Sequence, residues 1–266
     1  MHHYNRPSFA EALRAVGIKK GDIVFSHSHI GFFGIPEGEK SEANAFRTIL
    51  DAFIDVIGEE GTLIVPTFTY SFPQKKVFDP AESPSDCGIF TEKLRRLPEA
   101  YRSLDPCVSV AAIGRYAKNL TEGVPENAYG ENSFFDRFYK AGGVICNMNF
   151  DAGSTLIHYA ERILNVPYRF DKTFDGIIRE NGVERAARST IWVRQLVPGT
   201  EAKMEPFSAL AKERGLFNVA KIGRGAVGMI TAADTVSLVA ETLPQRPWFL
   251  TEAEGMAIIP DIKVRV

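Results

Sequence analysis

The stretch SEANAFRTILDAFIDVIGEEGTLIVPTF (residues 41–68) decides the fold class, because it joins an amphipathic helix to a buried strand through a short turn. In its first part, apolar residues recur every three or four positions, which is the spacing of one helical face. They are Phe46, Ile49, Leu50, Phe53 and Ile57. Gly58 is a typical helix stop. The apolar run GTLIVPTF that follows is typical of a strand buried on both faces.

The alternation of strand and helix continues on both sides of that stretch. Short runs rich in apolar and β-branched residues predict strands at 21–27, 61–68, 108–114 and 143–150. Amphipathic spacing predicts helices at 8–17, 41–58, 89–98, 133–142 and 155–164. Such alternation is typical of a sheet that contains parallel strand pairs and is covered by helices.

The second half of the chain has a different pattern, with shorter connections between its apolar segments. We expect a strand at 189–197 and a hairpin-like pair of strands at 218–223 and 226–231. Helices are expected at 205–215 and 232–243. These additions predict antiparallel pairing, and therefore an α/β fold with a mixed sheet. Because no linker-like change in composition marks a boundary, we expect a single domain over residues 1–266.

One connection is unusually long. Residues 69–88, TYSFPQKKVFDPAESPSDCG, contain prolines and aromatic side chains but no helical or strand periodicity. A connection of about twenty residues inside a compact domain is usually functional or disordered. Its aromatic residues favour a packed loop that lines a cleft.

Composition excludes several classes of protein. The chain has 266 residues and a net charge of −2, without a long basic block, so we expect no nucleic-acid partner. No apolar run reaches the roughly 18–20 residues of a membrane span, and the first residues lack a signal-peptide layout. The odd and widely spaced Cys87, Cys107 and Cys146 argue against a disulfide framework and favour a reducing cytoplasm. The sequence leaves open whether the chain forms a homo-oligomer.

The segment GSTLIHYAER (153–162) carries the first candidate for chemistry. On a helix, Thr155, His158 and Glu161 share one face, because residues three apart are neighbours. A histidine in the first turn of a helix that follows a strand lies where ligands commonly bind in α/β sheets. The helix N-terminus also favours the neutral ring, which can act as a general base. The plain alternative is a solvated polar helix face, and spacing alone favours that alternative.

Two further patterns offer other chemistries. His27 and His29 form an HxH pair that, together with His158, could ligate zinc in an amidohydrolase. Histidines that simply form hydrogen bonds at a strand end are the more frequent case. The segment GRGAVG (223–228) has the spacing of a dinucleotide-binding loop, but it is followed by a strand rather than a helix. Turn glycines account for it better.

Four segments together resemble the aminoglycoside 3-N-acetyltransferase family of CoA-dependent N-acyltransferases. GDIVFSHSHIGFFG (21–34) is similar to the family's His-Ser-Ser-Leu strand and turn, and GTLIVPTFTYSF (61–72) to its Pro-Thr-Phe strand. RSLDPCVSVAAIG (102–114) and STLIHYAE (154–161) resemble two further family motifs in the same order. The resemblance spans about residues 8–245 and implies a three-layer α/β/α fold with a mixed sheet.

The resemblance also implies site residues and a co-substrate. His158 corresponds to the family's general base, and Glu205, in MEPFSALAKERG, is our candidate for the carboxylate that orients the ring. Thr155 is expected beside the base. Acyl-CoA is the implied co-substrate, with no metal, and its expected contacts are Ser28, His29, Ile30, Gly31, Phe32, Thr67, Ser109 and Val110. The expected contacts of the small-molecule amine are Tyr70, Asp151 and Glu161, the last of which could instead pair with Arg162 or Arg169.

Two positions depart from the family pattern: Asp105 and His29 stand where the family usually has His and Ser. A strongly acidic cleft would steer a polycationic antibiotic, whereas this chain carries a net charge of only −2. We therefore expect an amino sugar linked to a nucleotide as the acceptor, with an aminoglycoside as the alternative. A non-catalytic homologue that binds CoA is the third hypothesis.

Overall fold

The core of the protein is one seven-stranded mixed sheet, seen in a computed structural model that describes residues 3–41 and 45–256. The strand order is β3-β4-β2-β1-β5-β9-β8. The central strand β1 pairs in parallel with β2 and β5, and the outer pairs are antiparallel. The bounds are β1 Ile23–Phe25, β2 Thr62–Pro66, β3 Tyr101–Arg102, β4 Val110–Gly114, β5 Val144–Met148, β8 Asn218–Ile222 and β9 Gly225–Thr231.

The sheet separates two hydrophobic cores, because alternate side chains of each strand point to opposite faces. In β1, Ile23 and Phe25 enter one core and Val24 enters the other. In β2, Ile64 enters the first core, while Leu63 and Val65 enter the second. All of these strand residues are buried, as expected for central strands that are covered on both faces.

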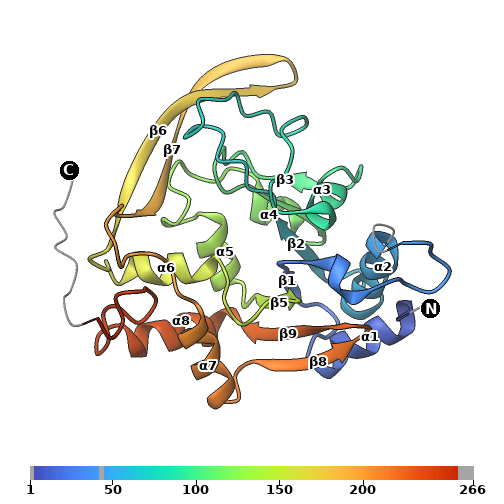
Figure 1. Ribbon diagram of the computed structural model, residues 1–266. Helices are drawn as coiled ribbons and strands as arrows, with labels where there is room; N and C mark the ends of the chain where they lie inside the picture. The colour runs from blue at the N-terminus through green and yellow to red at the C-terminus, as the bar shows by residue number, and fades with distance from the viewer. Residues whose placement is uncertain (1–2, 42–44, 257–266) are drawn as a thin grey trace.

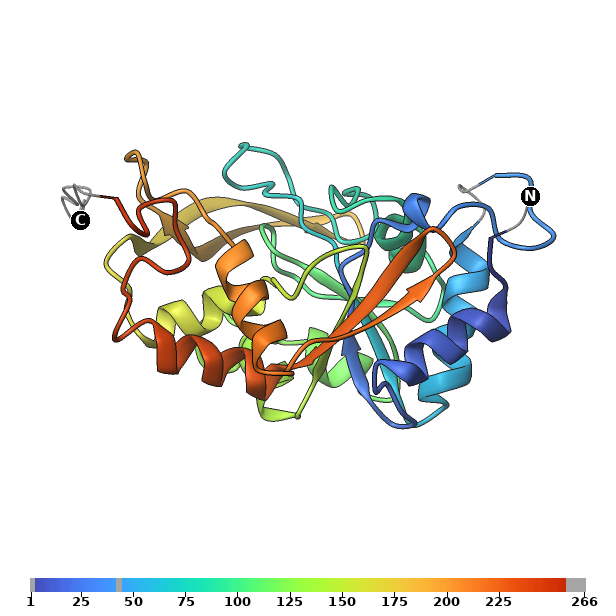
Figure 2. The same ribbon diagram turned by 60° about the horizontal axis from the view of Figure 1, so that its bottom comes forward.

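Helices cover both faces, so the predicted three-layer α/β/α fold with a mixed sheet is confirmed (Figure 2). The first face carries α4 Ala117–Thr121, α5 Phe134–Lys140, α6 Leu156–Ile163, α7 Glu205–Glu213 and α8 Ala232–Thr242. The second carries α1 Arg6–Ala15, α2 Ala45–Ile57, α3 Ile89–Arg95 and the 3-10 turn η1 Ile30–Phe33. The short elements β3, α4 and η1 were not expected. No helix in the described residues is long and apolar enough to cross a membrane.

A long hairpin stands apart from the main sheet (Figure 1). Its strands are β6 Arg169–Glu180 and β7 Val183–Arg194, joined at Asn181 and Gly182, which both have positive φ. The sequence prediction contained only a strand at 189–197 and missed β6. An Asn-Gly pair is a strong hairpin signal because both residues tolerate positive φ, and it could have identified the turn.

The loop of residues 69–88 is packed, as predicted. Phe72 and Phe78 are buried, and a backbone bridge joins Phe78 to Ile178 of the hairpin. Arg102 anchors the loop, because its guanidinium donates hydrogen bonds to the carbonyl oxygens of Thr67, Pro80 and Ser83. The guanidinium also lies 5.2 Å from the centre of the Phe78 ring. The geometry of the loop therefore depends on one arginine of the strand β3.

We expect Phe53→Ala to lower the free energy of unfolding by about 3–5 kcal/mol, because it leaves a cavity in a packed core. Phe53 is 0% exposed, whereas its neighbour Ile54 is 42% exposed. The matched control Ile54→Ala should cost less than about 1 kcal/mol. Urea unfolding followed by circular dichroism measures both. Equal losses for the two variants would contradict the assignment of this helix face to the core.

Candidate active site

The candidate site lies at the carboxyl ends of the parallel strands. The segments that leave β1, β2 and β5 meet there, at residues 26–34, 67–70 and 149–155. Backbone hydrogen bonds join the first and third of these, from Met148 N to His27 O and from His29 N to Met148 O. This is the edge where ligands commonly bind in open α/β sheets.

Asn147, at the end of β5, shapes the turn that leads into α6. Its side-chain amide donates to the carbonyl oxygens of Asp151 and Gly153, at 2.5 Å and 2.9 Å. Its Oδ1 lies 3.2 Å from His27 Nδ1. The other ring nitrogen of His27, Nε2, lies 3.2 Å from Thr155 Oγ1. The hydroxyl of Thr155 is therefore committed to His27, although Thr155 stands at the N-cap of α6.

His158 and Glu161 form a pair on α6. Nδ1 of His158 lies 2.7 Å from Oε2 of Glu161, one helical turn further on. The His158 side chain is 22% exposed and that of Glu161 is 0% exposed. A carboxylate bonded to Nδ1 favours the tautomer with the proton on Nδ1. The lone pair is then on Nε2, which is the nitrogen available to accept a proton.

The base of the hairpin supplies two further contacts to the Glu161 carboxylate. The Tyr168 hydroxyl donates to Oε1 at 2.8 Å, just before β6 begins. Nε of Arg169, the first residue of β6, lies 2.9 Å from Oε2 in a buried ion pair. Of the two arginines expected as partners of Glu161, the structure brings in Arg169, whereas Arg162 pairs with Asp171.

This arrangement shifts the pKa values of both members of the pair. Burial and the nearby Arg169 charge lower the pKa of His158, and together they outweigh the opposite effect of Glu161. Burial alone would raise the pKa of Glu161, but His158, Arg169 and Tyr168 lower it. The pair therefore holds an ionised carboxylate and a neutral imidazole near pH 7, which is the state that a general base requires.

Aromatic side chains close one side of the site. The ring of Tyr129 meets His158 edge-on at 6.0 Å and stacks on Phe135 at 4.8 Å. Burial raises the pKa of Tyr129 well above its ordinary value, with smaller effects from Tyr70 and Arg169 among others. Tyr129 therefore stays a neutral phenol. Tyr70, an expected acceptor contact, is exposed, and it lies close enough to Tyr129 to affect the pKa of that phenol.

The structure corrects the expected partner of His158. Glu205 begins α7 and is exposed, in a pocket of about 280 Å³ that it shares with Phe150, Asp151 and Met204. The carboxylate at the imidazole is that of Glu161, because a residue three positions along the same helix already lies within hydrogen-bond reach. Glu161 was expected to line the acceptor side, but it is wholly buried. Asp151 and Glu205 instead share the accessible pocket next to Gly153.

The residues expected at coenzyme A fall into two groups. Ser28, His29, Ile30, Gly31 and Phe32 follow β1 and form the turn η1, where Phe32 is exposed, Ile30 is buried in the core, and the His29 ring stacks on Phe150 at 4.2 Å. The other group is Thr67, Ser109 and Val110, which are all fully buried. The hydroxyls of Thr67 and Ser109 bond to each other and to Arg102. Their side chains therefore pack inside the protein and offer no open surface to a ligand.

The histidines do not come together as a metal site. Both ring nitrogens of His27 have partners, and His29 stacks on Phe150. Within residues 3–41 and 45–256, no group of three or more histidine, cysteine, aspartate or glutamate side chains is placed to share an ion. The three-histidine set of the zinc hypothesis is therefore not assembled.

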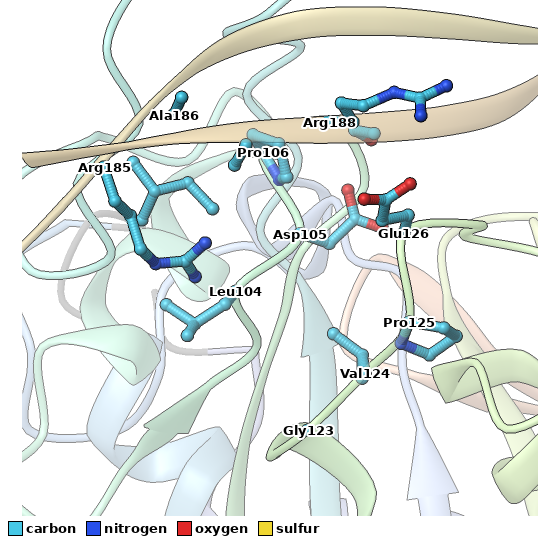
Figure 3. A pocket seen from close by; sticks show the side chains of 13 residues that line it. Leu104, Asp105, Pro106, Gly123, Val124, Pro125, Glu126, Arg185, Ala186 and Arg188 are labelled. Carbon is cyan, nitrogen blue, oxygen red and sulfur yellow. The ribbon is translucent and has the colours of Figure 1, made fainter.

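Asp105, which departs from the family pattern, has a structural role. Its Oδ1 accepts hydrogen bonds from the backbone N–H groups of Cys107 and Val108, and so holds the turn before β4. It also lines a pocket of about 290 Å³ under the hairpin, with Glu126 and Arg185 among the lining residues (Figure 3). That pocket carries charges of both signs.

Sequence patterns missed Tyr168, Tyr129 and Asn147, and they named Arg169 only as one of two possible partners of Glu161. All four residues lie outside the motif helix: Tyr168 and Arg169 at the base of the hairpin, Tyr129 before α5, and Asn147 in β5. The segment VPYRF (166–170) closely follows the motif helix, and the adjacent Tyr168 and Arg169 in it were the available signal.

Comparisons with known proteins agree on one family. A family model described as aminoglycoside 3-N-acetyltransferase matches residues 26–244. The aminoglycoside N(3)-acetyltransferase VII of Streptomyces paromomycinus is 31% identical over 183 residues, which are 61% of this chain and 62% of that protein, so the match spans less than two thirds of that relative. The aminoglycoside N(3)-acetyltransferase IX of Micromonospora chalcea is 28% identical over 255 residues, 84% of each chain.

A solved structure gives the same fold. The binary complex of AAC-IIIb with CoASH superposes on this chain with a TM-score of 0.79 at 23% identity. The superposition covers 91% of this chain and 97% of the other. The three-layer arrangement of helices around a mixed sheet is therefore that of an aminoglycoside acetyltransferase.

Acid should destabilise the protein through its buried histidines. Burial lowers the pKa of His27 to about 4, against the opposing effect of Asn147. Between that value and the unfolded pKa of about 6.5, only the unfolded chain binds the proton, so stability present above pH ~6.5 is lost as the pH falls. His27→Gln should make this loss shallower, as measured by urea unfolding across the range. An unchanged slope in His27→Gln would contradict the burial of this ring.

Proposed function

The chain belongs to the aminoglycoside 3-N-acetyltransferase family, and from this premise we propose that it transfers an acyl group from acyl-CoA to the amine of an amino sugar. The observation that carries the proposal is the bond between the His158 ring and the buried Glu161 carboxylate. It supplies an oriented, neutral base at the carboxyl edge of the sheet. Three free cysteines fit a reducing compartment, and we propose the cytoplasm.

In the proposed reaction, Nε2 of His158 takes a proton from the acceptor nitrogen as that nitrogen attacks the thioester carbonyl. The Nδ1 proton stays on the ring, held by Glu161. The new amide C–N bond replaces the C–S bond, and the imidazolium returns its proton to the departing thiolate. Glu161 stabilises the imidazolium during this cycle, which is the role of a carboxylate bonded to the far ring nitrogen.

The turn after β1 is our proposed contact for coenzyme A. Ser28 is 8% exposed, and its Oγ has no hydrogen-bond partner among the described residues. A buried hydroxyl without a partner is costly, so a polar group of the bound co-substrate would satisfy it. Exposed Phe32 and His29 lie on the same turn, and Phe150, which follows β5, stacks on the His29 ring.

An aminoglycoside amine is our first choice of acceptor. The curated relatives are named aminoglycoside N(3)-acetyltransferases, and the pocket beside Phe150 offers the exposed Glu205 carboxylate to a cationic sugar. The choice of a nucleotide-linked amino sugar as the acceptor rests on the small net charge of −2. A panel that includes both acceptor classes and acetyl-CoA, with thiol release followed by a thiol reagent, separates them. Turnover restricted to nucleotide-linked sugars would overturn our first choice of acceptor. Tight CoA binding without turnover of any acceptor would overturn the proposal that the chain is an enzyme.

The assignment of the base predicts two losses of activity. We expect His158→Asn to lower kcat/KM by about 10²–10⁴-fold, the usual contribution of a general base. Glu161→Gln should lower kcat on the order of 10²-fold, because an amide no longer holds the correct tautomer or stabilises the imidazolium. Steady-state kinetics with acetyl-CoA measures both.

Glu205→Gln distinguishes the two carboxylates. Since Glu205 lies in the neighbouring pocket, its substitution should act mainly on the KM of a polycationic acceptor and leave kcat within a few-fold. The opposite result, a collapse of kcat in Glu205→Gln with a near-normal Glu161→Gln, would return the orienting role to Glu205.

A further inference from the structure

The Glu161 carboxylate is fully buried and has a cation in direct contact. The Arg169 side chain is 8% exposed, and its Nε lies 2.9 Å from Oε2 of Glu161. Its Nη1 donates to the carbonyl oxygen of Trp192 on β7, at 3.2 Å. The guanidinium is thus fixed between the motif helix and the two strands of the hairpin base.

The charges at this point balance only when the imidazole is neutral. Glu161 contributes one negative charge and Arg169 one positive charge, so a neutral His158 leaves the buried cluster uncharged. A buried carboxylate that loses its cationic partner is strongly destabilised. In the absence of Arg169, the adjacent His158 ring would be the nearest group able to supply the compensating charge, by taking up a proton. A ring that already carries that proton cannot accept another from an amine.

We propose that Arg169 is a positioning residue of this site, which holds the Glu161 carboxylate against His158 and balances its charge so that the ring is free to act as a base. The catalytic part of this proposal rests on the proposed function. The effect of Arg169 on the protonation of His158 does not, because it is a property of the folded protein alone. The other groups that face the pair are the phenols of Tyr168 and Tyr129. Tyr70 and Asp105 lie close enough to Tyr129 to raise the pKa of its phenol.

The pKa shifts agree in direction with this geometry. Arg169 lowers the pKa of His158, whereas Glu161 raises it. Removal of the guanidinium should therefore move proton uptake by the His158–Glu161 pair to higher pH. Removal of the Glu161 charge with Arg169 in place should move the titration of His158 to lower pH. The charge balance is testable because the two substitutions should shift the His158 titration in opposite directions.

The experiment is an NMR titration of the His158 ring carbon-bound protons in the full chain, with acid-limb measurements of kcat/KM alongside. We expect Arg169→Gln to move both the ring titration and the acid limb to higher pH. A rise of about one in the pKa of the base lowers kcat/KM about tenfold on the acid limb, because the neutral fraction of the ring falls about tenfold there. Arg169→Lys keeps the charge and should restore most of the wild-type titration. The control Arg162→Gln removes an arginine that pairs with Asp171 on the neighbouring surface, and it should leave the titration in place.

An unshifted His158 titration in folded Arg169→Gln would overturn the proposal, as would an equal shift in Arg162→Gln. If Arg169→Gln does not fold, as judged by thermal unfolding, Glu161→Gln supplies the test, because its titration must move in the opposite direction, to lower pH. A rise in the Glu161→Gln titration would also overturn the charge balance. Failure of the proposed function would appear differently: the wild type would show no turnover, while the variants would still show the expected shifts in the His158 titration.

Discussion

The site depends on one buried carboxylate. Glu161 is inaccessible to solvent, and it is acceptable there only because an imidazole, a phenol and a guanidinium surround it. A buried charge with a single partner would cost several kcal/mol. The three groups come from one turn of α6 and from two successive residues, Tyr168 and Arg169. A loss of either the helix or the hairpin base would therefore leave this charge uncompensated.

The hairpin thereby acquires a role beyond its own twenty-four paired residues in β6 and β7. Its base holds Tyr168 through a hydrogen bond from Gln195 N and holds Arg169 through the carbonyl of Trp192. Further along, bridges to Phe78 and Asn127 fasten it to the loop above the sheet and to the turn before α5. Through the hairpin, the His158–Glu161 pair is in this way tied to the loop of residues 69–88 and to the turn before α5.

Much of the fold follows from local patterns, and the site follows only in part. The runs around 23–25 and 62–66 are apolar on both faces because the sheet is covered on both sides, and this signal survives in a single sequence. The strand β6 was missed because RFDKTFDGIIRE is mostly polar and partly exposed, with no buried stripe to mark it. Periodicity also placed Glu161 on the polar face of α6, but it cannot say that the hairpin covers that face. The choice of Glu205 failed for the same reason: its distance from His158 is a property of the tertiary fold.

Charge neutrality inside the proposed catalytic cluster has a consequence for how an amino-sugar acceptor would be recognised. Glu161 and Arg169 cancel, so the cluster itself exerts little long-range attraction on a cationic sugar. Attraction must then come from carboxylates at the surface of the cleft, and one of them, Asp151, is already paired with Lys212 at 2.6 Å. Recognition by a strong acidic field is thus reduced in this chain. For the acceptor that we propose, shape and hydrogen bonding in the pocket beside Phe150 and Glu205 would then carry a larger share of the selection, which fits a chain whose net charge is only −2.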